Sequence, residues 1–364
     1  MKLKILTMAA VTGAFFNSGN LLFAEWNGGD AQVIPASIYG TDDRQDVGDS
    51  GLKMKALSAS AVTLFLESSL SSGAAGSYSI PADAGTLGDN RGMAPGERFT
   101  NQVQAAYCSG ALVGDDLIFT AGHCIKESGI GDFDCAKDKL IFGFAIGKKG
   151  GSAPTTFAKK DVYGCKEIVA WKRENSPKTD YAVIRLDRKV EGRTPLAISR
   201  KDDLKVGDKL FVIGNPDGLP IKVAGGAKVR SMPKGEPYFF TDLDTFHGNS
   251  GSPVFNARTY RIEGILVRGD NDYVNTSSGT RTDIFPQEKG AGEEVTKISE
   301  IKSFLPVTLF EKFLDYKEML LGKPAQEAKP VPAVYFPGSG GPSVQPAVYY
   351  PDPVPTRVEE PISI

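Results

Sequence analysis

The chain has 364 residues, of which 41% are apolar and 24% charged, and its formal net charge at neutral pH is −2. This length allows two domains, or one large β domain with appendages. The near-zero net charge gives no reason to expect a nucleic acid or another polyanion as a partner.

The N-terminus has the pattern of a secretory signal. Lys2 and Lys4 precede an apolar run over residues 5–16, which is too short to span a bilayer well. Polar residues follow, and Ala24 is placed as the last residue before cleavage. We expect residues 1–24 to be a signal peptide, with an uncleaved anchor as the alternative. After cleavage we expect a secreted or periplasmic protein without stable membrane insertion.

The next segment, residues 25–94, is rich in Ser, Gly and Ala. The part around residues 37–44 is expected to be ordered, and residues 68–95 are expected to be loop or linker. We therefore expect an N-terminal segment outside the main domain, and it could be a prosegment that is removed after export.

From about residue 105 to residue 301 the pattern is all-β, because short apolar runs alternate with Gly, Pro and Asp turns. Few stretches have a helical period, which disfavours a parallel βαβ sheet. The clearest expected strands are residues 111–113, 117–120, 181–186, 209–213 and 262–267.

One helix is predicted near the end of this region. Thr308 and Glu311 form a candidate capping box, and Gly322 is placed to end the helix. Its apolar residues predict a helix packed on the β core. Residues 95–322 would then be the main domain, and the Pro-rich residues 323–364 would be an extended, disordered tail.

Four cysteines in an exported protein predict two disulfides, for which three pairings are possible. We favour Cys108 with Cys124, which would fix the loop that carries His123, and Cys135 with Cys165. The cysteines are not in close pairs, so we expect no metal site, and no cofactor is expected either.

Three short segments carry the chemistry. They are residues 120–124 with His123, residues 180–186 with Asp180, and residues 248–253 with Ser250. A general base, a carboxylate that orients it and a serine on a glycine-rich turn are the groups needed for nucleophilic acyl transfer. The only other histidine, His247, is too close in sequence to Ser250 to fold back onto its hydroxyl.

Each segment is weaker evidence alone than together. Asp180 starts an apolar strand, which suits a shielded orienting carboxylate but also a simple strand cap. The glycines around Ser250 let the N–H groups of Gly248 and Ser250 converge where an oxyanion would form, although Gly-x-Ser-x-Gly also fits a β-turn.

On these residues the chain resembles the trypsin-like (chymotrypsin-fold) serine peptidases, and within them the bacterial branch related to the glutamyl endopeptidases. The order His123, Asp180, Ser250 matches that family and differs from subtilisins and α/β-hydrolases. The resemblance covers roughly residues 95–305. It implies two antiparallel β-barrels of chymotrypsin type with a C-terminal helix. It also implies a disulfide between Cys108 and Cys124 beside the catalytic histidine.

The resemblance also addresses specificity. Asp244 stands six residues before Ser250, where the family has the floor of its primary pocket, and Asp there selects Lys or Arg. Gly269 matches a pocket-wall glycine. Two alternatives stay open, because Asp244 could turn away and bind backbone, and Arg268 could attract an acidic side chain.

We therefore predict an exported serine endopeptidase that acts through an acyl-enzyme, with cleavage after Lys or Arg. Alternatives are glutamyl endopeptidase specificity, or a protease-fold binding or adhesion protein without activity. Its partners would be protein or peptide substrates, with no nucleic acid, and the protein would be a monomer. The residue before Ser250 is Asn249, which has no charge to hold a new N-terminal ammonium, so a trypsin-type zymogen switch is not expected.

Overall fold

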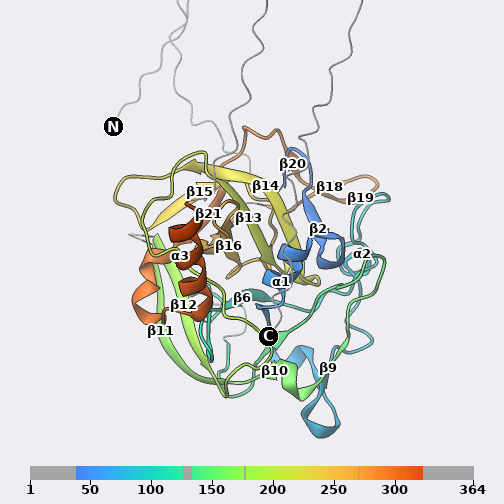
Figure 1. Cartoon of the computed structure of the whole chain (residues 1–364). Helices are drawn as coiled ribbons and strands as arrows, with labels where there is room; N and C mark the ends of the chain where they lie inside the picture. The colour runs from blue at the N-terminus through green and yellow to red at the C-terminus, as the bar shows by residue number, and fades with distance from the viewer. Residues whose placement is uncertain (1–37, 126–132, 176–177, 270, 323–364) are drawn as a thin grey trace, which may run out of the picture. The chain divides into compact units, whose positions relative to one another are not determined.

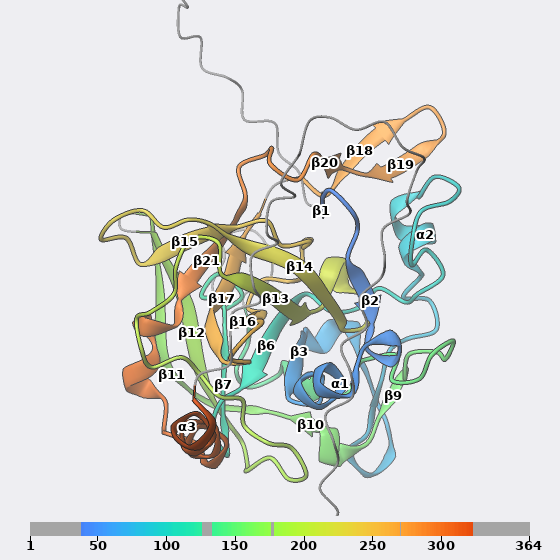
Figure 2. The ribbon, with the colours of Figure 1, turned by 45° about the horizontal axis from the view of Figure 1, so that its top comes forward.

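The computed structural model describes residues 38–125, 133–175, 178–269 and 271–322. The expected signal peptide and Pro-rich tail lie outside these residues. Two seven-stranded antiparallel β-sheets are the largest sheets of the described chain (Figures 1 and 2). The prediction of an all-β fold with two barrels and a C-terminal helix is confirmed.

The first sheet closes into a barrel because the strands at its two edges follow each other in the chain. Its strand order runs β10-β8-β3-β6-β7-β12-β11, and only Gly164 separates β10 from β11. β10 pairs with β8 at one end and β11 pairs with β12 at the other, so the two ends of the sheet are joined covalently. The strands are β3 (Ala61–Phe65), β6 (Cys108–Leu112), β7 (Leu117–Thr120), β8 (Lys139–Phe142), β10 (Val162–Tyr163), β11 (Cys165–Asn175) and β12 (Lys178–Leu186).

The second sheet closes through its own hydrogen bonds. β13 pairs with both β14 and β16, which completes a ring of six strands in the order β13-β16-β17-β21-β15-β14. β2 adds to the outside of β14. The strands are β2 (Arg44–Asp46), β13 (Lys209–Gly214), β14 (Lys222–Ser231), β15 (Tyr238–Thr241), β16 (Pro253–Asn256), β17 (Ile262–Arg268) and β21 (Glu293–Lys297).

Smaller elements surround the barrels. They are α1 (Leu52–Ser58), α2 (Leu87–Arg91), the pair β1 (Ile38–Tyr39) and β20 (Ile284–Phe285), the hairpin β18 (Tyr273–Thr276) and β19 (Gly279–Thr282), and the sheet of β4 (Ser71–Ser72), β5 (Tyr78–Ser79) and β9 (Thr156–Phe157).

One apolar cluster joins the two barrels. It includes Phe119 and Ile184 of the first barrel together with Phe211 and Phe255 of the second, and all four are at most 3% exposed. Removing this apolar surface from water favours a fixed contact between the barrels, at about 25 cal/mol per Å². This apolar contact therefore holds the two barrels in a fixed arrangement.

The barrels begin earlier in the sequence than expected. β3, which was assigned to the N-terminal segment 25–94, lies between β6 and β8 in the middle of the first sheet. All five residues of β3 are buried. The boundary predicted at residue 95 is therefore wrong, because removal of residues 25–94 would take a central strand out of the first barrel.

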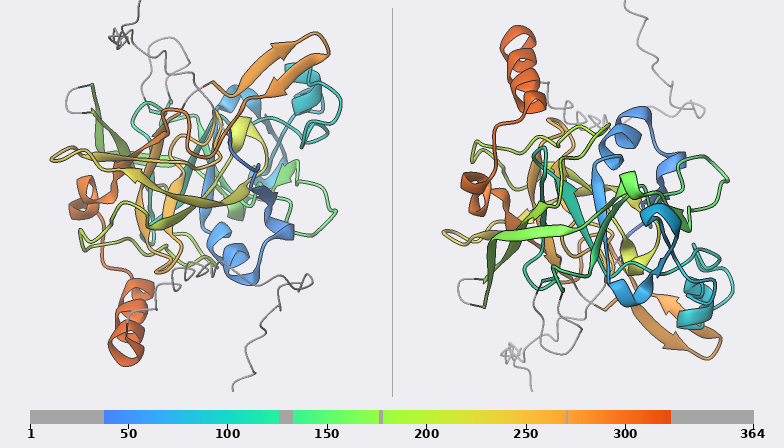
Figure 3. Two further views of the ribbon diagram at one scale, coloured as in Figure 1. Left: turned by 90° about the horizontal axis from the view of Figure 1, so that it is seen from above. Right: turned by 90° about the horizontal axis from the view of Figure 1, so that it is seen from below.

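The C-terminal helix, α3 (Leu309–Leu321), forms as predicted, and the Thr308 hydroxyl accepts a hydrogen bond from the N–H of Glu311 at 3.1 Å. Of its apolar face, Phe310 packs against the buried cluster as expected, but most of the other apolar side chains do not. Leu309, Phe313, Tyr316 and Leu320 are 57–83% exposed, and α3 projects from the barrels in both views of Figure 3.

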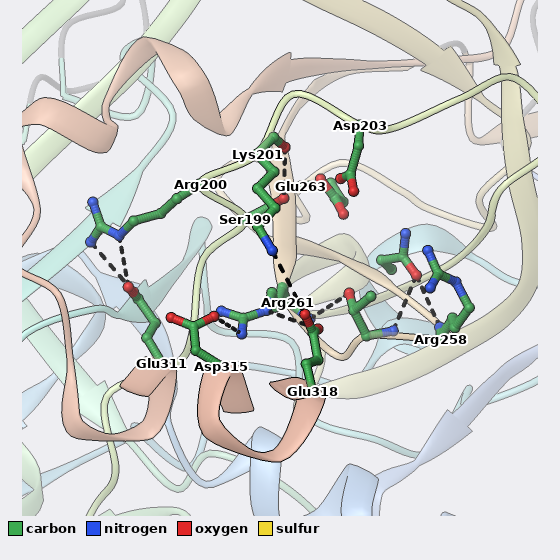
Figure 4. A pocket seen from close by; sticks show the side chains of 12 residues that line it. Ser199, Arg200, Lys201, Asp203, Arg258, Arg261, Glu263, Glu311, Asp315 and Glu318 are labelled. Atoms are coloured by element: carbon green, nitrogen blue, oxygen red, sulfur yellow. Dashed lines mark hydrogen bonds and ion pairs between the residues drawn. The ribbon is translucent and has the colours of Figure 1, made fainter. Parts of the chain in front are cut away.

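An acidic face attaches α3 to the second barrel instead. Glu311 pairs with Arg200 at 2.7 Å, and Asp315 pairs with Arg261 at 2.7 Å. Figure 4 shows these carboxylates pointing toward the arginines of the barrel, with Glu318 alongside. The side of α3 that faces the barrels thus combines Phe310 with these carboxylates.

Within the described ranges, no helix is both long enough and apolar enough to span a membrane.

Candidate active site

Ser250 lies on a tight loop that leads into β16. Gly251 has a φ of +87°, and a Cβ there would lie 2.9 Å from the N of Ala121, so glycine is required. The N–H of Gly251 donates to Leu266 O at 2.7 Å, and the N–H of Ser109 donates to Ser250 O at 2.8 Å. Strands of both barrels therefore hold the serine in place.

Gly248 stands on the other side of Ser250 and has a φ of +83°. A Cβ at this position would lie 2.6 Å from Asn215 O and 2.8 Å from the N of Gly218, so a larger residue would displace the loop. Among the hydrogen bonds of the described residues, the N–H groups of Gly248 and Ser250 donate to no protein acceptor.

His123 and Asp180 form a two-point contact. The backbone N–H of His123 donates to Asp180 Oδ1 at 3.0 Å, and its ring Nδ1 lies 2.9 Å from Asp180 Oδ2. When Nδ1–H of a neutral imidazole donates to this carboxylate, Nε2 is the ring nitrogen that can accept a proton. The contact fixes both the tautomer and the orientation of the ring.

The loop around His123 depends on a close approach of backbone. A Cβ on Gly122 would lie 2.9 Å from Tyr181 O and 3.1 Å from Asp180 Oδ1. The indole N–H of Trp171 donates to Gly122 O at 2.7 Å. The disulfide between Cys108 and Cys124 links the same loop to β6, and a second disulfide joins Cys135 to Cys165. These are the two pairs favoured from the sequence.

Asp180 is 1% exposed. Burial by itself raises the pKa of this carboxyl, but the hydrogen bonds and charge of His123, together with the charge of Arg268, outweigh burial and lower the pKa. Arg268 Nη2 lies 3.4 Å from Asp180 Oδ2, while its Nη1 donates to Glu294. Asp180 therefore stays ionised, and Arg268 is shared between two carboxylates.

A cavity of about 700 Å³ brings these groups together, because His123, Asp180 and Ser250 all line it. A second cavity of about 340 Å³ is lined by His123 and Ser250 as well, with Gly248 on its wall. Ser250 and His123 thus lie where the two cavities meet. A cleft that binds an extended peptide on both sides of the bond to be cleaved would have this arrangement.

A comparison with protein-family models matches residues 108–265 to a family described as "Trypsin-like peptidase domain". The match includes His123, Asp180 and Ser250.

Residues 108–265 are thus similar to a trypsin-like peptidase domain.

Curated relatives of the trypsin-like domain carry the name "Probable periplasmic serine endoprotease DegP-like". The relative from Halomonas elongata is 27% identical over 199 residues, which is 53% of this chain and 35% of the relative. The relative from Ectopseudomonas mendocina is 34% identical over 108 residues, or 28% of this chain and 21% of the relative. The chain thus spans about a third or less of their length.

Among solved structures, that of the Vibrio cholerae VesB protease aligns with 73% of this chain and 66% of its own, at 15% identity and a TM-score of 0.45.

Asp244 is not the floor of the cavity in the trypsin-like domain, and the prediction of that role is wrong. Its Oδ1 accepts the N–H of Tyr39 at 2.9 Å, and its Oδ2 accepts the N–H of Asp43 at 2.7 Å. Burial raises the pKa of Asp244 to about 7, although these two hydrogen bonds act to lower it. The carboxylate holds the N-terminal segment and does not line the cavity.

Gly269 does line the cavity, as predicted for a wall residue, and His247 lies at its rim with a side chain that is 81% exposed. The open alternative for Arg268, attraction of an acidic side chain, is weakened because Asp180 and Glu294 already neutralise its charge.

A polar cluster beside the cleft was not predicted from the sequence. Arg91 of α2 lines both cavities and pairs with Asp217 at 2.5 Å, and the Tyr273 hydroxyl donates to Asp217 at 2.7 Å. Burial and the neighbouring Asp217 charge raise the pKa of Tyr273. Arg91 lies in the segment taken for a linker, so no local pattern marked it.

Proposed function

We propose that this chain is a serine endopeptidase that hydrolyses peptide bonds through an acyl-enzyme on Ser250. The observation that carries the proposal is the two-point contact between His123 and Asp180 at a cavity that Ser250 also lines. A serine hydroxyl needs a neutral, oriented imidazole to become a nucleophile, and this contact supplies one.

The reaction follows from these positions. Ser250 Oγ attacks the carbonyl carbon of the substrate while its proton passes to His123 Nε2. The negative oxygen of the tetrahedral intermediate accepts hydrogen bonds from the N–H groups of Gly248 and Ser250, and one such donor is typically worth roughly 10²–10³ in turnover. His123 then gives the proton to the leaving amine, and a water molecule, activated by the same imidazole, releases the acid.

We further propose that the enzyme acts in the periplasm or outside the cell, on protein or peptide substrates, as a monomer. The pattern of residues 1–24, two disulfides, and relatives whose names call them periplasmic support this location. Because β3 belongs to the first barrel, any trimming of an N-terminal prosegment would fall before the barrels, upstream of Ile38.

We also propose that the enzyme cleaves peptide bonds after Lys or Arg. Asp244 no longer supports it, so its support must come from other groups in the cavity.

Labelling with a serine-directed fluorophosphonate tests the activity. The wild-type chain should be labelled and should cleave peptides, whereas Ser250→Ala should do neither while unfolding at the same urea concentration. A folded wild-type chain that is neither labelled nor active, before and after limited proteolysis, would favour the rival reading of a protease-fold binding protein.

A further inference from the structure

The outward face of α3 is apolar and uncovered. Leu309, Phe313, Tyr316 and Leu320 keep more than half of their surface in contact with solvent. Because each residue of an α-helix turns the chain by about 100°, these four positions fall within an arc of about 60° and form one stripe along the helix. No other part of the described chain packs over this stripe, as the projecting helix in Figure 3 shows.

Further apolar side chains extend this stripe at both ends. Met319 and Leu321 in the last turn of α3 are 71% and 74% exposed, and Val307, just before the helix, is 50% exposed. Single exposed apolar residues are common on soluble proteins, but a row of them on one helix face is typical of a surface that binds a partner.

The carboxylates of α3 are turned away from the apolar stripe. Glu311, Asp315 and Glu318 each lie beside an arginine or lysine of the neighbouring loops, as Figure 4 shows for the first two. Their negative charges are therefore compensated on the side of the helix that faces the barrels.

Two lysines border the stripe instead. Lys312 stands four residues before Tyr316, and Lys317 stands four residues after Phe313, so one ammonium group lies on each side of the stripe. Both lysines are exposed, and neither forms an ion pair with another described residue. The outward half of α3 is thus an apolar strip between two uncompensated positive charges, which complements a negatively charged surface.

The size of the strip bears on what it can bind. A helix of 13 residues is about 20 Å long and about 10 Å wide, so one face covers roughly 200 Å². Stable protein partners each bury about 800 Å², so a second copy held through this face alone would have far too little contact. A lipid bilayer sets no such minimum, because apolar side chains enter it singly while cations meet its headgroups.

We propose that α3 docks the protein on an anionic lipid surface. The helix lies in the plane of the bilayer, with Phe313 and Leu320 at the boundary between headgroups and acyl chains. Lys312 and Lys317 pair with lipid phosphate groups on either side. At 13 residues, α3 is too short to cross the bilayer and lies on it.

Flotation of the full chain with lipid vesicles tests this surface. One set of vesicles is phosphatidylcholine with about one third phosphatidylglycerol, and the other is phosphatidylcholine alone, both at about 0.1 M salt. Wild type should bind the anionic vesicles at least ~10-fold more strongly than the neutral ones, because two lysines face the headgroups.

Two double variants separate the apolar and the charged contributions. Phe313→Ser with Leu320→Ser should lower the partition coefficient for anionic vesicles by at least ~30-fold. Lys312→Gln with Lys317→Gln should lower it by about 30-fold and leave partition into neutral vesicles unchanged.

The matched control replaces exposed apolar residues elsewhere. Val274→Ser with Ile284→Ser changes side chains that are 42% and 56% exposed on β18 and β20, which lie away from α3 in Figures 1 and 2. Partition of this control should stay within about twofold of wild type. An equal loss of binding in the control and in the α3 variants would overturn the proposal.

Other outcomes would also overturn it. They are a wild-type chain that floats with neither vesicle, and α3 variants that float as well as wild type. A wild-type dimer in ultracentrifugation that Phe313→Ser with Leu320→Ser makes monomeric would show that a second copy covers the face. If this double variant unfolds at a lower urea concentration, Phe313→Ser alone is used, with an expected loss of about fivefold.

Docking of this kind requires no peptidase activity, so the two proposals can fail separately. Ser250→Ala should float as wild type does. A wild-type chain that floats but cleaves no peptide would overturn the endopeptidase function and leave the lipid-binding face. A chain that cleaves peptides but does not float would overturn the lipid-binding face alone.

Discussion

Replacement of Asp180 by asparagine tests the geometry of the site most directly. Both oxygens of Asp180 accept a hydrogen bond from His123, one from the backbone N–H and one from ring Nδ1. An asparagine side chain has one oxygen and one NH₂ group, so it can satisfy only one of these donors. If the NH₂ group faces the ring, Nδ1 becomes the acceptor and the proton moves to Nε2, which can then no longer accept the serine proton.

The loss should be large. In the opposite orientation, the NH₂ group of the asparagine faces the backbone N–H of His123, two donors oppose each other, and the loop shifts. Loss of the orienting carboxylate in this kind of triad lowers kcat by about 10⁴, or about 5.5 kcal/mol in the activation free energy. The destabilisation of the fold should be smaller, about 1–3 kcal/mol for one buried donor left unsatisfied.

Asp242→Asn is the matched control. Asp242 is 3% exposed, and its two oxygens accept the N–H of Lys228 at 2.6 Å and the side chain of Gln287 at 2.9 Å. Peptide hydrolysis and urea unfolding should show similar losses of stability in both variants, with a fall in kcat/KM in Asp180→Asn alone. An Asp180→Asn enzyme within tenfold of wild type would refute the assigned role.

Three further outcomes are expected. Arg268→Gln removes one of the charges that lower the pKa of Asp180, so kcat/KM should begin to fall at a higher pH on acidification in the variant than in wild type, and a fall that begins at a lower pH would contradict the argument. Replacement of Cys108 and Cys124 by serine should lower the free energy of unfolding by about 3 kcal/mol in urea titrations, because the closed loop spans 16 residue steps. Burial raises the pKa of Asp244 to about 7, so the stability from its proton is present below about pH 4 and lost as the pH rises through 7. Urea titrations at pH 5 and pH 8 should therefore show a decline in stability that is smaller in Asp244→Asn than in wild type.

The sequence predicted well those features that depend on local pattern. The strands expected at residues 117–120, 181–186 and 262–267 are β7, β12 and β17, because alternating or continuous apolar runs between turns leave few other structures. His123, Asp180 and Ser250 were found for a related reason. The glycines and apolar neighbours that each needs lie beside it in the chain.

The direction in which a side chain points could not be predicted in this way where its contacts come from residues distant in sequence. Asp244 stands at the expected distance before Ser250, but its orientation is set by backbone N–H groups more than 200 residues away, at Tyr39 and Asp43. Glu293 lies 48 residues after Thr245 in sequence, so no local spacing marked their contact. β3 is different. The apolar run Ala61–Phe65 is typical of a fully buried strand, but the Ser-rich residues around it led to the prediction of a segment outside the barrels.

The attachment of α3 by ion pairs gives this part of the molecule its own response to salt. Dissolved ions screen exposed pairs more than buried ones, and Asp315 is 58% exposed while Glu311 is 2% exposed. Rising ionic strength should therefore free the C-terminal turns of α3 first and leave its first turn anchored. Salts such as sulfate strengthen apolar burial, so the same change that tightens the barrels loosens the helix that follows them.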